Sequence, residues 1–162
     1  MANSDKPRGF RPYGDIIRVV PYTAGAAVYP GDAVHLENDG KVDPAVASEA
    51  LLGVAASYAA ADGDEVLVWD SPDQKFIVQS DNGTTLAQTA VGLNYNIVDT
   101  AGDSTYKQSR QELDSDSGAT TPSTLPLRLI AFDREQGNAA GEFAECIVQI
   151  NNHQLGRNTV GL

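Results

Sequence analysis

The stretch Phe143-Ala-Glu-Cys-Ile-Val-Gln-Ile150 decides the fold class, because small and apolar residues recur in it at every second position. A strand would place these alternate residues on one face, whereas a helix would scatter them around its axis. They are Ala144, Cys146, Val148 and Ile150. The same alternation returns in Leu125–Phe132, at Leu125, Leu127, Leu129 and Ala131. Both stretches are predicted to be strands with one buried face.

Shorter runs on the amino-terminal side of these stretches also have the residue types of strands. Their bounds are Ile16–Tyr22, Ala33–Leu36, Leu51–Ala55, Glu65–Asp70, Lys75–Ser80 and Gly92–Val98. Turn residues separate several of them, at Pro30-Gly31-Asp32, Asn38-Asp39-Gly40, Asp62-Gly63-Asp64 and Asn82-Gly83. We expect a mainly β chain arranged as a barrel or a sandwich. Short helices are expected only at Pro44–Leu52 and Thr85–Ala90.

The formal net charge of −11 at pH 7 limits the classes of partner. Nucleic acid is not expected, because binding to its phosphates needs a clustered Lys/Arg surface. A membrane is not expected either, since the sequence lacks an apolar run of bilayer length and its start lacks the apolar core of a signal peptide. The single cysteine, Cys146, suits a reducing compartment, so synthesis in a cytoplasm is expected.

The first residues differ from the rest in charge and in backbone freedom. Four cations face only Asp5 and Asp15 in the first eighteen positions: Lys6, Arg8, Arg11 and Arg18. Pro and Gly residues between positions 7 and 14 disfavour a helix or a central strand. Residues 1–22 are interpreted as an extended arm that docks on an acidic protein surface, with Phe10 and Tyr13 as anchors. A solvated tail, or aromatic rings that fold back on their own domain, are the alternatives.

Residues 23–162 are predicted to form one β-rich domain with a long polar excursion at 99–124. That excursion has only Tyr106 and Leu113 as sizeable apolar residues. The Asp114-Ser-Asp116-Ser-Gly118 stretch within it resembles the start of a calcium loop. It lacks the glycine spacing and the terminal glutamate of an EF-hand, so turns formed by its short polar side chains are expected instead.

The inventory of catalytic groups is small, and we expect no enzymatic activity. His35 and His153 are the only histidines, and neither stands at a metal-binding spacing from Cys146. The sequence contains no Gly-x-Ser-x-Gly motif, phosphate loop or dinucleotide fingerprint. No cofactor or metal is therefore expected.

The aromatic residues Trp69 and Phe76 lie in predicted strands, where such side chains belong to a core or a subunit interface. Arg128 needs a carboxylate partner or an edge position, because an unpaired buried charge is costly.

Several segments, in order along the chain, resemble those of the head-decoration, or capsid cement, proteins of tailed phages. Tyr29–Val34 is similar to a P-G-D-x-V entry strand, Asp39–Val42 to the turn after it, and Leu51–Ala55 to an L-G-V-A segment. Glu65–Trp69 with Phe76–Gln79 resembles the family's central hairpin, and Gly9–Gly14 resembles a G-F-R-P-x-G start. The segments together span most of the chain, but each is short.

This resemblance implies a single compact β-barrel or β-tulip-like domain that trimerises on the outer surface of a mature capsid. The partners would be the major capsid protein and two further copies of this chain, and the location would be the virion. The implied capsid-binding residues are Arg8, Phe10, Arg11, Tyr13, Arg18 and Tyr22. Candidate subunit-interface residues are Trp69, Phe76 and Arg128.

Two other functions remain open on the sequence alone. A carbohydrate- or receptor-binding β module of a virion or cell surface would need an exposed aromatic platform. A hydrolase would need His35 or His153 beside a nucleophile.

Overall fold

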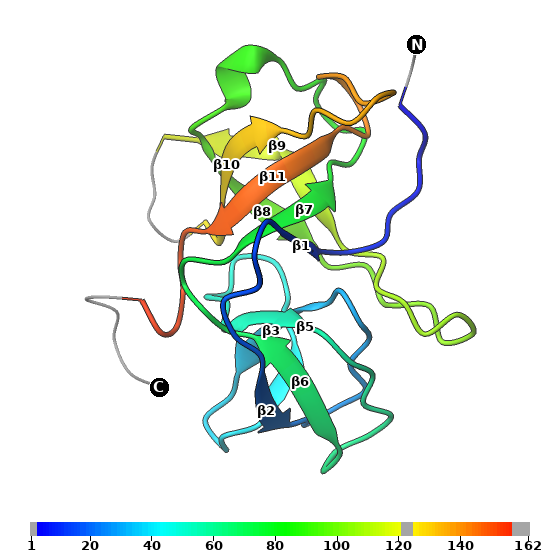
Figure 1. Ribbon diagram of the computed structural model, residues 1–162, viewed down its shortest axis with the longest axis vertical. Helices are drawn as coiled ribbons and strands as arrows, with labels where there is room; N and C mark the ends of the chain where they lie inside the picture. The colour runs from blue at the N-terminus through cyan, green and yellow to red at the C-terminus, as the bar shows by residue number, and fades with distance from the viewer. Residues whose placement is uncertain (1–2, 121–124, 157–162) are drawn as a thin grey trace.

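A computed structural model describes residues 3–120 and 125–156, which form two antiparallel sheets stacked along the long axis of the molecule (Figure 1). Sheet A has the strand order β1-β7-β11-β10-β8-β9, and sheet B has the order β2-β6-β5-β3-β4. The strands of sheet A are β1 (Arg11–Tyr13), β7 (Lys75–Gln79), β8 (Asn94–Val98), β9 (Glu112–Ala119), β10 (Leu127–Phe132) and β11 (Glu145–Ile150). Those of sheet B are β2 (Val20–Thr23), β3 (Ala33–Leu36), β4 (Val42–Pro44), β5 (Gly53–Ala55) and β6 (Glu65–Trp69).

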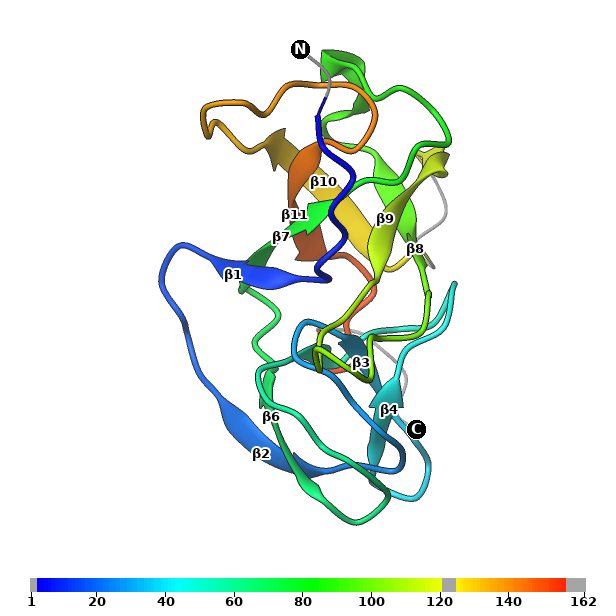
Figure 2. The same cartoon turned by 90° about the vertical axis from the view of Figure 1, so that its right-hand side faces the viewer.

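In the sequence, all strands of sheet B lie between the first and second strands of sheet A. Strand β1 belongs to sheet A, the next five strands build sheet B, and β7 returns to pair with β1. The crossing from β1 to β2 runs over the outside of the molecule (Figure 2). The amino-terminal segment therefore supplies an outermost strand to each sheet.

Each sheet covers its own hydrophobic cluster. The larger cluster includes Phe76, Leu113, Leu127 and Leu129. The smaller one includes Val34, Val42, Val66 and Val68. Residues from sheet B, such as Ala33 and Val54, also join the larger cluster. The ring of Trp69 on β6 packs at 6.5 Å from that of Phe76 on β7. These contacts join the two sheets across the middle of the molecule.

The structure confirms the mainly β class, and each predicted strand overlaps an observed one. The predicted closed barrel is wrong, because sheet A curls but does not close. Its outer strand β9 approaches the end of β7, where Leu113 forms an isolated bridge with Ser80, and the ladder stops there. A bulge in β10 between Leu129 and Ala131 accompanies the curl.

The two predicted helices are also wrong within the described part of the chain. Pro44 ends strand β4 opposite Val34, and Leu51 forms a bridge with His153, so Pro44–Leu52 is a non-helical connection with a turn at Ala47–Ser48. Only Gln88–Ala90 of the second segment is helical, as one 3-10 turn named η1. In the first segment, pairing with β3 and with His153 overrides the local preference.

The polar excursion 99–124 contains a long strand, which corrects its interpretation as a loop. Strand β9 occupies Glu112–Ala119 and pairs with β8. It alternates buried Leu113 and Ser115 with more exposed neighbours. The hydroxyl of Ser115 donates to Asp81, and that of Thr84 donates to Asp116 at 2.5 Å. Residues 121–124 lie outside the described residues.

Candidate protein-binding surface

The amino-terminal segment lies along the body of the protein. Phe10 is only 2% exposed, and its ring meets Phe76 edge-on at 6.4 Å. Its backbone N–H donates to the carbonyl of Gly31 at 2.8 Å. The two aromatic rings therefore pack in the core, and neither Phe10 nor Phe76 presents a surface to a partner. Both are removed from the set of predicted contact residues.

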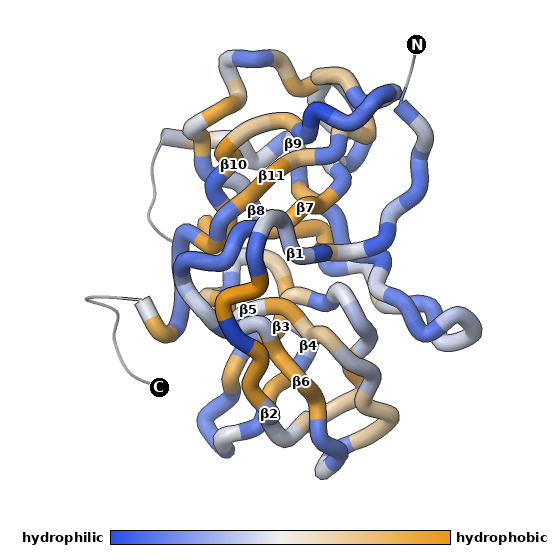
Figure 3. Tube along the Cα trace, viewed as in Figure 1, coloured by the Kyte–Doolittle hydropathy of each residue, from blue (hydrophilic) through white to orange (hydrophobic). Residues whose placement is uncertain are grey.

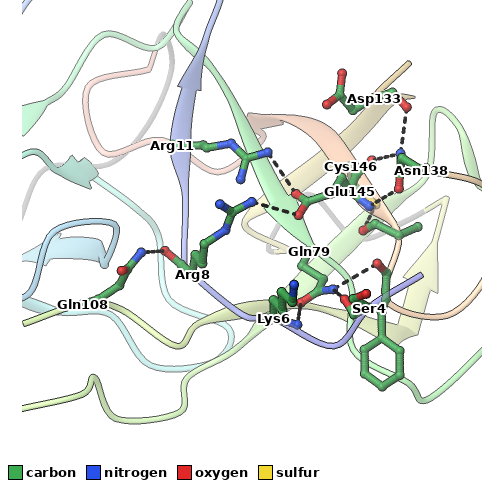
Figure 4. Close-up of polar contacts among 12 residues, drawn as sticks. Ser4, Lys6, Arg8, Arg11, Gln79, Gln108, Asp133, Asn138, Glu145 and Cys146 are labelled. Carbon is green, nitrogen blue, oxygen red and sulfur yellow. Dashed lines mark hydrogen bonds and ion pairs between the residues drawn. The ribbon is translucent and has the colours of Figure 1, made fainter. Parts of the chain in front are cut away.

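Three of the four cations of this segment, Arg8, Arg11 and Arg18, lie beside acids of the same chain, and Figure 4 shows the first two. Arg8 and Arg11 reach the two carboxylate oxygens of Glu145, at 3.6 and 3.4 Å. Nearby, the side-chain amide of Gln79 accepts from the N–H of Lys6 and donates to the carbonyl of Ser4. Exposed pairs such as these contribute about 0–1 kcal/mol each, but they orient the segment. Arg8 and Arg11, which were predicted to attract an acidic partner, therefore pair with an acid of their own chain.

Arg18 and Tyr22 converge on one buried carboxylate. Asp70, 3% exposed, accepts from Nε of Arg18 at 2.5 Å and from the hydroxyl of Tyr22 at 2.7 Å. Burial, followed by the hydrogen bond to Asp70, raises the pKa of Tyr22 to about 12. The hydroxyl therefore stays a donor at physiological pH. The two residues fasten the segment to the end of β6.

Between these attachments the segment exposes apolar side chains. Ile16 is 55% exposed, Ile17 52% and Val19 42%, in the crossing from β1 to β2. In Figure 3 the crossing shows orange, hydrophobic stretches on either side of a blue, hydrophilic one. The N–H of Ile17 donates to the side chain of the buried Gln74 at 3.0 Å, which fixes the backbone beneath it.

Sheet B extends this surface. Pro21 on β2 stands opposite Leu67 on β6, and both are exposed. Directly opposed residues of antiparallel strands point to the same face. We call Ile16, Ile17, Val19, Pro21 and Leu67 the apolar strip. Exposed apolar side chains gathered along two neighbouring strands and the crossing before them make this strip a candidate for protein interaction.

Three further residues predicted from the sequence to be contacts lie on three different strands: Tyr13, Trp69 and Arg128. Tyr13 is 43% exposed on β1, close in sequence to the apolar strip. Trp69 is partly buried against the larger cluster, and its Nε1 has no hydrogen-bond partner. Arg128 is exposed on β10, where its Nε donates to the amide oxygen of Asn94 at 3.0 Å. An amide thus takes the place of the predicted carboxylate partner.

A second exposed feature is the loop before β9, which presents Tyr106 at 81% exposure. Asp103 orders this loop by accepting from the N–H groups of Thr105 and Tyr106 and by pairing with Arg110 at 2.7 Å. The ammonium of Lys107 lies 5.0 Å from the centre of the Tyr58 ring. Tyr106 is therefore held outward by a structured base, which its polar sequence surroundings did not indicate.

The potential catalytic groups are not arranged as a nucleophile and its base. Burial raises the pKa of the Cys146 thiol, which lies in the core. His153 is buried, and its Nδ1 accepts from the N–H of Leu155 at 3.0 Å. Nδ1 of His35 faces the carbonyl of Ala50 at 2.7 Å. Within the described residues, neither histidine is hydrogen-bonded to a hydroxyl or a thiol.

Comparisons with known proteins yielded no match, either to a family model, to a curated protein or to a solved structure. In the part of the chain that the structure describes, no helix is long and apolar enough to cross a membrane.

Proposed function

We propose that this chain is a non-catalytic decoration protein that binds the outer surface of a mature tailed-phage capsid as a trimer. The apolar strip is the observation that supports this proposal most directly. All of it except Leu67 belongs to the amino-terminal segment that the resemblance to cement proteins assigns to capsid contact. The major capsid protein is the proposed partner.

The strip suits a protein contact because its backbone is already ordered. The flanking residues are held by Gln74 and Asp70, so binding would freeze mainly side chains. Fully burying an isoleucine contributes about 1.5–3 kcal/mol relative to leaving it exposed. Ile16 and Ile17, each about half exposed, could each add roughly 1 kcal/mol or more on docking. Avidity from three copies would multiply such modest contacts.

The proposed function is to stabilise the capsid by binding, without a chemical reaction. A protein that binds the mature lattice and not its precursor stabilises the mature form by mass action. On this proposal the residues of the segment divide into two roles. Arg8, Arg11, Arg18 and Tyr22 support the segment through Glu145 and Asp70, while Tyr13 and the apolar strip offer the exposed contact area.

Co-sedimentation with mature capsids of the encoding phage, stripped of this protein, tests the proposal. We expect the double substitution Ile16→Asp and Ile17→Asp to weaken binding at least about tenfold, because each change removes an apolar anchor. Val46→Asp is the matched control, since Val46 is 50% exposed on the connection after β4. Circular dichroism confirms that the variants fold.

Wild-type capsid occupancy by the double variant would contradict the proposed contact. Loss of binding by Tyr106→Ala alone would move the contact to the loop before β9. Binding of a defined glycan on an array, removed by Tyr106→Ala, with no binding to capsids, would favour the carbohydrate-binding function instead. Tyr106 is the exposed aromatic side chain that such a function requires.

A further inference from the structure

Three potential metal ligands meet at the end of β3, at the point where the connection from β4 to β5 returns to it. They are His35, Glu37 and Glu49. Each offers one ligand atom, and the three atoms lie within 4.8 Å of one another. All three residues are partly exposed, so an ion and its remaining water ligands have access. Figure 2 shows β3 and β4 side by side near this place.

The histidine is oriented as a ligand would be. Its Nδ1 lies 2.7 Å from the carbonyl oxygen of Ala50, an acceptor, so Nδ1 carries the proton. Nε2 then keeps its lone pair. Histidines that bind metals commonly donate their other ring N–H to a backbone carbonyl, which fixes the tautomer and the ring orientation.

The backbone around the three side chains is held before any ion binds. The side chain of Gln154 brackets Leu36, accepting from its N–H at 2.7 Å and donating to its carbonyl at 3.0 Å. This contact fixes the residues on either side, His35 and Glu37. Glu49 accepts from the N–H of Val46 at 2.9 Å through one oxygen, which leaves its second oxygen for a ligand bond.

The connection that carries Glu49 is also fastened from its other side. The N–H of Ser48 donates to the side chain of Asn96 at 2.7 Å, and that of Ala47 donates to Asp99 at 3.1 Å. The loop therefore cannot swing away from β3 without breaking contacts to β8 and the residues after it. Three ligands on two separate elements are thus presented to one point.

We propose that His35, Glu37 and Glu49 bind a divalent first-row transition ion of the zinc type. One imidazole nitrogen and two carboxylate oxygens suit Zn²⁺, with water in the fourth position. Ligand atoms in a tetrahedral zinc site lie about 3.4 Å apart, so the side chains must close by no more than about 1.4 Å. The bound ion would link the β4–β5 connection to β3. This inference is independent of capsid binding.

Isothermal titration of the full-length, chelator-treated protein with Zn²⁺ tests the site. We expect one ion per chain and a higher thermal unfolding midpoint in its presence. His35→Gln and Glu49→Gln should each weaken Zn²⁺ binding at least about tenfold. Glu65→Gln is the matched control, because it removes one carboxylate from an exposed position on β6 and should leave the affinity unchanged.

A second measurement identifies the imidazole as a ligand. Co²⁺ should give visible absorption bands in the wild-type protein that disappear in His35→Gln. Failure of Zn²⁺ to bind the wild-type chain would overturn the proposal. So would affinity that is unchanged in His35→Gln and Glu49→Gln, or Ca²⁺ binding that exceeds Zn²⁺ binding and is indifferent to His35.

Discussion

At the scale of single residues, the partly buried Glu112 and the buried His153 should have opposite effects on the pH dependence of stability. Burial, with the nearby carboxylates Asp5 and Asp81, raises the pKa of Glu112 to about 7. Burial lowers the pKa of His153 to about 4. Between about pH 4.5 and 6.5 the folded chain therefore holds an extra proton on Glu112 and lacks one on His153, relative to the unfolded chain. In this window the contribution of Glu112 to stability falls as pH rises, and that of His153 increases.

Each substitution should expose the contribution of the other group. In Glu112→Gln the free energy of unfolding should increase, relative to wild type, as pH rises from 4.5 to 6.5. In His153→Gln it should decrease over the same range. We expect changes of about 1 kcal/mol, allowing for solvent screening of the partly exposed Glu112. Urea unfolding at a series of pH values measures this. Parallel curves for wild type and both variants would mean that neither pKa is shifted by folding.

At the scale of elements, the amino-terminal segment should be essential to stability. Phe10→Ala removes a buried ring from the larger cluster and should lower the free energy of unfolding by about 3 kcal/mol. Tyr13→Ala, three residues away and 43% exposed, is the control and should cost less than about 1 kcal/mol. Deleting residues 1–14 removes β1 as well and should cost more than either. An unchanged urea midpoint for Phe10→Ala would show that the segment detaches in solution.

The element scale also shows where prediction from sequence succeeds. Strands with alternating apolar residues, such as β10 and β11, follow from the sequence because side-chain burial is periodic. Strand β1 could not be predicted, since Arg11–Tyr13 includes a proline and has no alternation of its own. It is a strand because Pro12 lies opposite Phe76, far along the chain. Strand β9 was missed because its serine, aspartate and glycine residues favour turns locally.

The same difference between local pattern and long-range pairing explains which surface features could be predicted from the sequence. Ile16, Ile17 and Val19 were interpreted as part of a strand, yet the chain crosses between sheets there and leaves them exposed. The spacing of His35 and Glu37 is visible in the sequence. Their meeting with Glu49 depends on how the β4–β5 connection folds, which no local pattern encodes.

At the scale of the whole molecule, the two sheets should unfold together. The chain has one tryptophan, Trp69, on β6 of sheet B, and its ring packs against Phe76 of sheet A. Its fluorescence therefore reports on the junction, whereas far-ultraviolet circular dichroism reports on all strands. We expect both signals to change at the same urea concentration, as in a two-state transition. Two separated transitions would show that the sheets are independent units.

The nesting of sheet B between β1 and β7 also sets the order in which the chain can fold during translation. Every strand of sheet B is made by residue 69, so that sheet can form around its own valine-rich cluster while synthesis continues. Sheet A cannot be completed until β11 has left the ribosome, because β11 joins β7 to β10. Pairings between such distant segments form slowly. Phe10, among the first residues made, must wait for Phe76 before it can leave water.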